Sequence, residues 1–237
     1  MVYLLEKMAH REGIGDLLAE GVKTAAEKIG GGSDRFAIQV KGLEWTGYEA
    51  RWAPAMMLSY ITCDIGAHHN RSWAVTYDVA HGRDQLEGKA DKTIELQHIR
   101  PVFDLMGTCR LQWVEIGFES DHYGEIFPLI TGLPYGWDDL IHVAERVWHL
   151  TRSFNARENP GFGRGWDYPP ARFMEEPVPT GPAKGKFIPK ENIDLMLDEY
   201  YSKRGWTPEG IPTKKKLEEM GLAFAADSLE KAGYDLG

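Results

Sequence analysis

The fold class follows from one stretch of the sequence, WDDLIHVAERVWHLTRSF, which spans Trp137–Phe154. Its apolar side chains recur at the three- and four-residue intervals of an α-helix, and its charged side chains fall between them. The positions that share one face are Leu140, Ile141, Ala144, Val147, Trp148 and Thr151. We therefore predict a long amphipathic helix over residues 137–154, with one face packed against a core.

Helical patterns also dominate the rest of the chain, and more than half of its ordered residues should be helical. We predict further helices at 2–9, 16–29, 52–62, 89–106 (with Pro101 as a kink or a helix start), 120–130, 190–201, 213–220 and 223–232. One short strand is predicted at 36–41, where Phe36, Ile38 and Val40 alternate with Ala37, Gln39 and Lys41. Residues 159–186 are rich in proline and glycine and predict an extended, surface-wrapping arm.

The predicted fold class is therefore mainly α, an irregular multi-helix body with one short strand and a proline-rich arm. We divide it into a helical domain at 1–158 and a proline-rich arm with a helical tail at 159–237 that packs on it. The length of 237 residues fits one large domain or two small ones.

Composition excludes several classes of protein. The chain carries 27 Lys and Arg against 36 Asp and Glu, a net charge of −9, which argues against a nucleic-acid binder. No apolar run approaches the roughly 20 residues of a membrane helix, and residues 1–11 lack the pattern of a signal peptide. The two cysteines, Cys63 and Cys109, exclude a disulfide scaffold and a four-cysteine metal site made by this chain alone. We expect an acidic, soluble, cytoplasmic protein with no membrane partner.

The first segment that could carry chemistry runs from Asp104 to Cys109. Asp104 lies near the end of a predicted helix, and Gly107 permits a tight turn that a ligand can approach closely. A carboxylate can accept two hydrogen bonds from the amino and ring N–H groups of a heterocycle, and a thiolate can bind iron. The spacing alone nevertheless favours a plain helix end followed by a buried cysteine.

The second segment, Thr62–Arg71, holds the adjacent histidines His68 and His69 in a polar turn. A histidine can donate, accept or move a proton near neutral pH, and at most one of two neighbours should face a given site. The alternative is two surface or hydrogen-bonded histidines. A chelated metal is less favoured, because no second pair with ligand spacing lies nearby.

The third segment, Gly42–Arg51, offers Tyr48 as a hydrogen-bond donor and Glu44 as a carboxylate. The alternative is a connection from strand to helix, in which Glu44 caps a helix or pairs with Arg51. The sequence contains no Walker phosphate loop, no Gly-x-Gly-x-x-Gly and no Gly-x-Ser-x-Gly.

Together these segments resemble the C-terminal part of the aldehyde ferredoxin oxidoreductase family, which comprises tungsten- or molybdenum-dependent enzymes. The similarity covers almost the whole chain, and the matching segments follow the family's order. They are Gly13–Val22, Val40–Glu44 with Tyr48, Asp104–Cys109, Phe154–Arg157, Pro169–Arg172, Tyr200–Trp206 and Lys216–Leu222. The resemblance implies the irregular, multi-helix C-terminal domains of an oxidoreductase that interconverts aldehydes and carboxylic acids, with ferredoxin as its electron partner.

The resemblance also implies roles for individual residues in cofactor binding. Asp104 would hold the amino edge of one pterin of a tungsten (or molybdenum) bis-pterin cofactor, in the turn made by Gly107. Cys109 would be the fourth ligand of a 4Fe–4S cluster. Arg71 would lie near the cofactor.

His69 and Tyr48 match the family's active-site histidine and tyrosine, and they would face the metal and the substrate carbonyl. Interconversion of an aldehyde and a carboxylate moves two electrons together with protons, so a general acid or base is needed. The metal and its pterins would carry the electrons, while the protein positions the substrate.

Some parts of the family's pattern have no counterpart in this sequence. The family's other three cluster cysteines, a first Asp-x-x-Gly motif, a catalytic glutamate and a β-rich domain lie upstream. We therefore expect a fragment, a truncated reading frame or one half of a split enzyme. The other cluster cysteines would then lie in a missing N-terminal portion or a separately encoded subunit.

The substrate has two candidates. The pair His68-His69 is similar to the subgroup that includes the tungsten benzoyl-coenzyme A reductase subunit. An aromatic acyl thioester is therefore the alternative to a small aldehyde. The alternative to both enzymes is a non-catalytic fragment or an assembly module.

Overall fold

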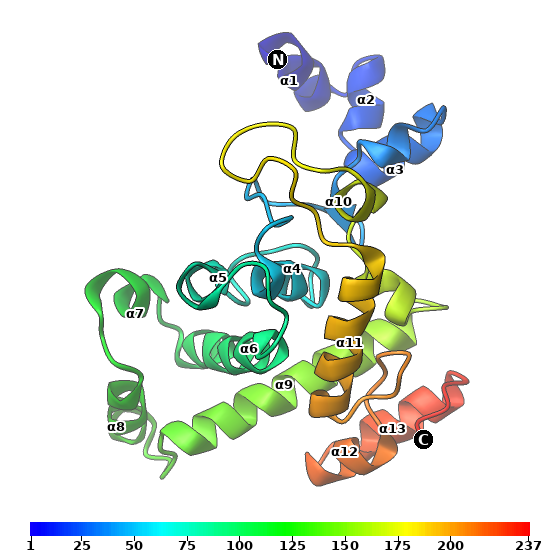
Figure 1. Cartoon of the computed structure of the whole chain (residues 1–237). Helices are drawn as coiled ribbons and strands as arrows, with labels where there is room; N and C mark the ends of the chain where they lie inside the picture. The colour runs from blue at the N-terminus through cyan, green and yellow to red at the C-terminus, as the bar shows by residue number, and fades with distance from the viewer.

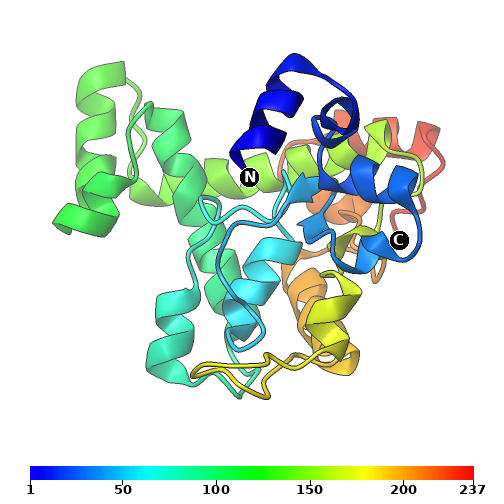
Figure 2. The ribbon, with the colours of Figure 1, turned by 90° about the horizontal axis from the view of Figure 1, so that it is seen from above.

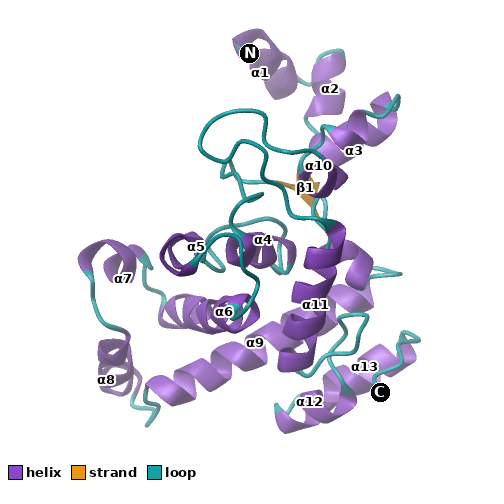
Figure 3. Cartoon of the chain, in the orientation of Figure 1, coloured by secondary structure: helices purple, strands orange, loops and turns teal.

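The computed structural model describes the backbone of residues 1–237 and the side chains of all of them except residues 114–116. Helices make up 57% of the chain, and the sheet is one small two-stranded ribbon, so the predicted mainly α class is confirmed (Figure 3). In chain order the elements are α1 (Val2–His10), α2 (Ile14–Leu18), α3 (Val22–Ile29), η1 (Ser33–Arg35), β1 (Gln39–Val40), β2 (Leu43–Glu44), α4 (Pro54–Ile61), α5 (Val75–His81), α6 (Lys89–Met106), α7 (Leu111–Ile116), α8 (Ser120–Thr131), α9 (Trp137–Glu158), η2 (Arg164–Asp167), α10 (Ala171–Glu175), α11 (Lys190–Arg204), α12 (Lys214–Glu219) and α13 (Ala223–Lys231).

The main core surrounds α4, in which every residue is buried. Helices α6 and α11 pack against it, and α9 passes beneath α6 (Figure 1). A second core joins the end of α9 to α12 and α13, through residues such as Leu217, Leu222 and Leu229. Helices α7 and α8 lie towards one end of α9, and α12 and α13 lie towards the other (Figure 2). Burial of these apolar faces is the dominant favourable contribution to folding.

The two longest helices agree closely with the sequence pattern. Helix α6 covers the predicted residues 89–106, with Pro101 inside the helix and Gly107 ending it in the left-handed conformation. Helix α9 begins at Trp137 as predicted but continues four residues beyond Phe154, to Glu158. The extension occurs because Ala156 is buried in the second core, and this tertiary packing continues the helix past the predicted end.

The N-terminal third differs from the prediction in two places. The single helix predicted at 16–29 is instead two helices, α2 and α3, separated at Gly21, which has φ 88°. The strand predicted at 36–41 is reduced to Gln39–Val40, which pairs antiparallel with the unpredicted β2. The turn between the two strands consists of Lys41 and Gly42, both with positive φ, as a two-residue hairpin requires.

Two further corrections concern helices. Helices α5 and α7 were not predicted from the sequence. The proline-rich arm is not wholly extended either, because it contains η2 and α10, and Phe173 of α10 packs into the main core. Arg51 donates to the backbone oxygen of Glu176 at 2.7 Å, which holds the arm on the body of the protein. The predicted division between residues 158 and 159 stays a prediction.

Four distant segments meet at the buried carboxylate of Asp167. Arg152 of α9 donates to its two oxygens at 3.0 and 2.6 Å, and Tyr201 of α11 donates at 2.6 Å. The Lys41 Nζ, from the β1–β2 turn, lies 2.7 Å from the same carboxylate. The segment around Lys41 that carries the family resemblance therefore serves here as a packing element, fixed to the helical body by a buried ion pair.

Candidate functional site

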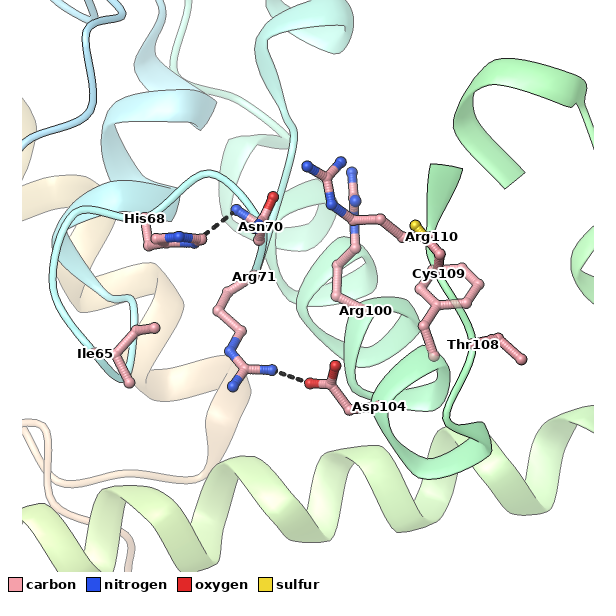
Figure 4. A pocket seen from close by; sticks show the side chains of 10 residues that line it. Ile65, His68, Asn70, Arg71, Arg100, Asp104, Thr108, Cys109 and Arg110 are labelled. Carbon is pink, nitrogen blue, oxygen red and sulfur yellow. Dashed lines mark hydrogen bonds and ion pairs between the residues drawn. The ribbon is translucent and has the colours of Figure 1, made fainter. Parts of the chain in front are cut away.

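The end of α6 forms one wall of a pocket. Gly107 (φ 65°) turns the chain, and its N–H donates to the Asp104 backbone oxygen at 3.2 Å. Nothing lies within 4 Å of where a Cβ of Gly107 would be, so the turn can be approached closely. The pocket, which we call the Asp104 pocket, has a volume of about 310 Å³ (Figure 4). It is lined by Ile65, His68, Asn70, Arg71, Arg100, Phe103, Asp104, Thr108, Cys109 and Arg110.

Asp104 and Arg71, two of the residues singled out in the sequence, face each other across this pocket. The Asp104 side chain is 66% exposed and forms an ion pair with Arg71 (Figure 4). Arg71 also lies 3.4 Å from Asp64. Burial opposes the charge of Arg71, but Asp64 and Asp104 outweigh it and raise the pKa of its guanidinium. Arg71 therefore fixes the direction in which the Asp104 carboxylate points.

Cys109 lies on the same pocket with its side chain exposed. The alternative interpretation, a helix end with a buried cysteine, is therefore wrong for Cys109. The chain's other cysteine, Cys63, is buried, and burial raises the pKa of its thiol to about 12. Since the thiolate is the form that binds metal, Cys109 is the thiol suited to a metal held at this surface.

His68 and His69 occupy different positions in one loop. Their rings are stacked, with centroids 5.3 Å apart, but only His68 lines the Asp104 pocket. The His69 ring lies beside Tyr48 and Trp73, at centroid distances of 5.6 and 5.8 Å. Tyr48 is 50% exposed and lies 5.1 Å from Trp73. The structure thus places the rings of His69 and Tyr48 side by side, and their joint role at an active site stays a prediction of the family resemblance.

The His69 ring is held neutral by its surroundings. Burial, followed by the positive charge of Arg110, lowers the pKa of His69 below its ordinary value. Its Nδ1 is buried and has no hydrogen-bond partner among the residues whose side chains are described. A neutral imidazole with a free ring nitrogen is suited to accept or relay a proton.

Glu44, the candidate carboxylate of the third segment, has a structural role. Its Oε1 accepts a hydrogen bond from the Val22 N–H at 3.0 Å and so caps α3. The suggested pairing with Arg51 is wrong, because Arg51 pairs with Glu49 at 2.7 Å. The capping alternative is confirmed.

Sequence reasoning missed Arg100, which is only 2% exposed. It lies between the Asp104 pocket and a second hollow of about 450 Å³ that we call the Trp73 groove. The groove is lined by Trp73, Thr76, Tyr77, Lys92, Glu95, Leu96, Arg100 and Trp113. A signal was present, because Thr93, Gln97 and Arg100 place polar groups at helical spacing on the face of α6 that is buried.

The Asp104 pocket fits a polar heterocycle as one wall of a larger site. The buried Thr108 Oγ1 has no hydrogen-bond partner among the described side chains and lines the pocket, as does the exposed Asp104 carboxylate. No group of three or more His, Cys, Asp or Glu side chains suitable for a metal ion occurs among the residues described. Cys109 can therefore contribute one ligand, and the other ligands of a metal cluster would have to come from elsewhere.

The family model described as "Aldehyde ferredoxin oxidoreductase, domains 2 & 3" matches residues 1–222. The chain belongs to the aldehyde ferredoxin oxidoreductase family. The expectation of a resemblance to the C-terminal portion of that family is thereby confirmed.

Curated relatives of this aldehyde ferredoxin oxidoreductase family member include proteins named as tungsten-containing. The tungsten-containing aldehyde ferredoxin oxidoreductase of Pyrococcus furiosus is 33% identical over 227 residues, covering 93% of this chain and 36% of the relative. That of Thermococcus kodakarensis is 32% identical over 228 residues, with the same coverage. An "aliphatic sulfonate oxidoreductase, WOR-like subunit" of P. furiosus is 29% identical over 240 residues, 96% of this chain and 35% of the relative. The chain therefore spans about a third of the length of these relatives.

The fold of this family member also occurs in a solved structure. A chain of "Active site complex BamBC of Benzoyl Coenzyme A reductase in complex with 1,5 Dienoyl-CoA" matches with a TM-score of 0.76 and 21% identity. The match covers 98% of this chain and 40% of the solved one. The likeness shows that the arrangement of helices is shared. As a separate finding, no helix in the described part of the chain is long and apolar enough to cross a membrane.

Proposed function

We propose that this chain forms one wall of a tungsten (or molybdenum) pterin site in an enzyme that interconverts aldehydes and carboxylic acids. The observation that supports it best is the Asp104 pocket. An exposed carboxylate and an exposed thiol lie there on one turn, and a neutral histidine stands beside a tyrosine nearby. The family membership and its tungsten-containing relatives add to this support.

The residues of the pocket would hold the cofactor in complementary ways. Asp104 would accept hydrogen bonds from the amino and ring N–H groups of a pterin, with Arg71 holding its carboxylate in place. Gly107 leaves room for the ring to approach the backbone. Cys109 would give one thiolate to a 4Fe–4S cluster. When bound, the metal, pterins and cluster would supply the two-electron chemistry and pass electrons to ferredoxin.

The chain's own contribution to the reaction is the handling of protons and the position of the substrate. Oxidation of an aldehyde adds an oxygen atom from water, removes two electrons and releases protons. His69, neutral and with a free Nδ1, would accept one of these protons, and the Tyr48 hydroxyl would donate a hydrogen bond to the carbonyl oxygen. In the reverse direction protonated His69 would return that proton, and the Tyr48 hydroxyl would donate the same hydrogen bond.

A further polypeptide would complete the site. No residue of α1 is buried, and the apolar side chains of Val2, Tyr3, Leu5 and the nearby Ile14 are exposed. Apolar patches of this kind mark surfaces that a partner covers. The partner would carry the remaining cluster ligands. Because both cysteines are free and one is exposed, we propose the cytoplasm, a reducing compartment, as the location.

A second candidate is the reduction of an aromatic acyl thioester. The observation that favours it is the aromatic wall of the Trp73 groove, where Trp73 contacts both Tyr48 and His69. An aromatic ring would stack there at favourable distances. The solved structure of similar fold is a benzoyl-coenzyme A reductase complex, which adds a chemical precedent.

The test compares His69→Ala with the matched control His68→Ala in the holoenzyme assembled with its partner polypeptide. We expect His69→Ala to lower aldehyde-dependent reduction of ferredoxin by about 10²–10⁴-fold, the range for a positioned acid or base. Tungsten and iron contents should not change, and His68→Ala should have a much smaller effect. Equal turnover in both variants would refute the assigned role. Benzoyl-coenzyme A assayed in parallel separates the second candidate from the first.

A further inference from the structure

Arg100 is a buried cation whose hydrogen-bonding groups are not used. Its Nε and Nη1 are buried and have no partner among the described side chains and backbone groups. Among the described side chains, the Trp113 ring faces it, with its centroid 5.2 Å from the Arg100 guanidinium carbon. Burial, followed by repulsion from Arg110, lowers the pKa of Arg100 to about 10, so it is still charged at neutral pH. A buried charge left in this state is costly unless something pairs with it.

The other buried arginines of the chain show what is missing. Arg152 forms two hydrogen bonds with the Asp167 carboxylate, at 3.0 and 2.6 Å. Arg204 donates to the Gln97 side chain at 2.7 Å and to a tyrosine hydroxyl. Arg51 pairs with a carboxylate at 2.7 Å. Of the buried arginines that the structure describes, Arg100 alone has donors with no acceptor.

The charged groups around Arg100 do not supply that acceptor. Asp104, on the adjoining pocket, is engaged by Arg71. Glu95, on the Trp73 groove, is engaged by Lys92 at 2.5 Å. No carboxylate among the described side chains forms an ion pair with Arg100. The remaining neighbour is another cation, Arg110, whose guanidinium lies on the same side of the Asp104 pocket in Figure 4. The local field therefore favours an anion from outside.

The adjoining space has the shape and chemistry to hold the rest of such an anion. The Trp73 groove has a volume of about 450 Å³, within the usual range for small-molecule sites. Three aromatic side chains, Trp73, Tyr77 and Trp113, form much of its wall, and Arg100 lines both the groove and the Asp104 pocket. Aromatic walls favour a flat ring, and a guanidinium fork favours a carboxylate held by two parallel hydrogen bonds.

We propose that Arg100 binds the carboxylate of an aromatic acid whose ring lies in the Trp73 groove. The site adjoins His69 and Tyr48, because Trp73 contacts both of them. The ligand would be the carboxylic acid that the proposed reaction forms from an aldehyde. Only this identification of the ligand rests on the proposed function. The binding site itself is carried by Arg100 and the aromatic wall, and it needs no bound metal.

Titration of the metal-free 237-residue chain with benzoate, followed by ligand-observed NMR, tests the proposal. Benzoate should bind saturably. Benzyl alcohol, which keeps the ring but lacks the charge, and acetate, which keeps the charge but lacks the ring, should each bind at least about tenfold more weakly. Inorganic phosphate should compete poorly. Absence of benzoate binding, or phosphate binding as tight as that of benzoate, would overturn the assignment.

Variants separate Arg100 from the rest of the surface. Arg100→Met should weaken benzoate binding at least about tenfold. Arg100→Lys keeps the charge but loses the guanidinium fork, so its affinity for benzoate should lie between those of the wild type and Arg100→Met. The matched control is Arg83→Met, because Arg83 also stacks on a tryptophan, Trp52, at 4.7 Å but lies outside the groove. It should leave benzoate binding unchanged.

Thermal unfolding distinguishes a binding role from a structural one. Removal of an unpartnered buried charge should leave the melting temperature of Arg100→Met unchanged or higher. A large fall would show that Arg100 supports the fold, and the proposal would be wrong. Thermal unfolding and the benzoate titration both use the metal-free chain. A negative result in the His69 experiment therefore does not bear on the Arg100 proposal, and a negative result with Arg100 does not bear on the role of His69.

Discussion

Replacement of Asp167 by asparagine should destabilise the chain severely. The Asp167 carboxylate is fully buried and meets two cations, Arg152 and Lys41, and the Tyr201 hydroxyl, all within 3.0 Å. Asparagine has nearly the same shape but no charge, and its amide N–H₂ would turn donors towards groups that are themselves donors. Both buried cations would then lack an anion.

Two features of the buried ion pairs set the expected loss of stability. Burial alone would raise the pKa of Asp167, but Arg152 and Lys41 outweigh it and lower the pKa from 3.8 to about 2. At 1.36 kcal/mol per pKa unit, this difference corresponds to about 2 kcal/mol of stability at neutral pH. Removal of one partner of a buried ion pair typically costs about 3–5 kcal/mol, because a buried charge is left uncompensated. We expect the larger figure, since the variant strands two cations.

Urea unfolding at pH 7, followed by circular dichroism and tryptophan fluorescence, measures the effect. The matched control is Asp84→Asn, which removes an exposed ion pair with Lys186 and should cost less than about 1 kcal/mol. The pKa of Asp167 is lowered in the folded state, so its contribution is complete above pH 3.8 and disappears as the pH falls towards 2. The difference in free energy of unfolding between the wild type and Asp167→Asn should disappear over the same pH range. Equal destabilisation by the two variants at pH 7 would show that the buried ion pairs of Asp167 contribute no more than an exposed one.

Three further predictions concern the pH dependence, the histidine loop and the cofactor wall. Burial, followed by the Arg204 guanidinium, lowers the pKa of His98 to about 3, so the wild type should lose stability as the pH falls from 6.5 towards 3. His98→Gln should make the free energy of unfolding, measured with urea, depend less on pH. An unchanged pH dependence would show that His98 is not its source. Gly66 has φ 103°, and a Cβ there would lie 2.7 and 2.8 Å from atoms of the β1–β2 hairpin. Gly66→Ala should therefore cost about 1–3 kcal/mol or more in thermal unfolding, and a neutral result would contradict this packing. In the assembled enzyme, elemental analysis should find that Asp104→Asn has little tungsten but full iron. Cys109→Ser should have little iron but full tungsten, because serine is a poor iron ligand. Full tungsten and iron in both variants would show that the turn after α6 is only a helix end and binds neither group.

Local sequence patterns predicted the helices well where the signals were strong. Helix α6 matches its prediction at both ends, and Gly107 ends it as expected. The break at Gly21 was missed because an apolar stripe runs through residues 16–29, whereas Glu44, distant in sequence, caps the second helix from outside. Tertiary packing likewise decided the extra turn of α9. Periodicity reports which face is apolar, but it cannot report partners that come from another segment.

The candidate site was predicted in composition but not in geometry. Sequence patterns drew attention to Asp104, Cys109 and the histidine pair, and the fold gathers them around one pocket and its neighbourhood. Arg100 was missed because a charged residue on an amphipathic helix is ordinarily assigned to the solvent-facing side, although it shares a face with Thr93 and Gln97, which are also buried. The pairing of Lys41 with Asp167 was missed as well, since the two residues lie in distant segments.

If this chain supplies one wall of a shared metal and pterin site, the native protein should carry the metals. Elemental analysis and visible absorbance of the protein, isolated anaerobically from its own cells with its bound partners, measure this. We expect tungsten or molybdenum and about four iron atoms per chain, in a complex with a polypeptide that carries the other cluster ligands. A chain isolated alone, intact and without tungsten, molybdenum or iron, would show that it forms no such site.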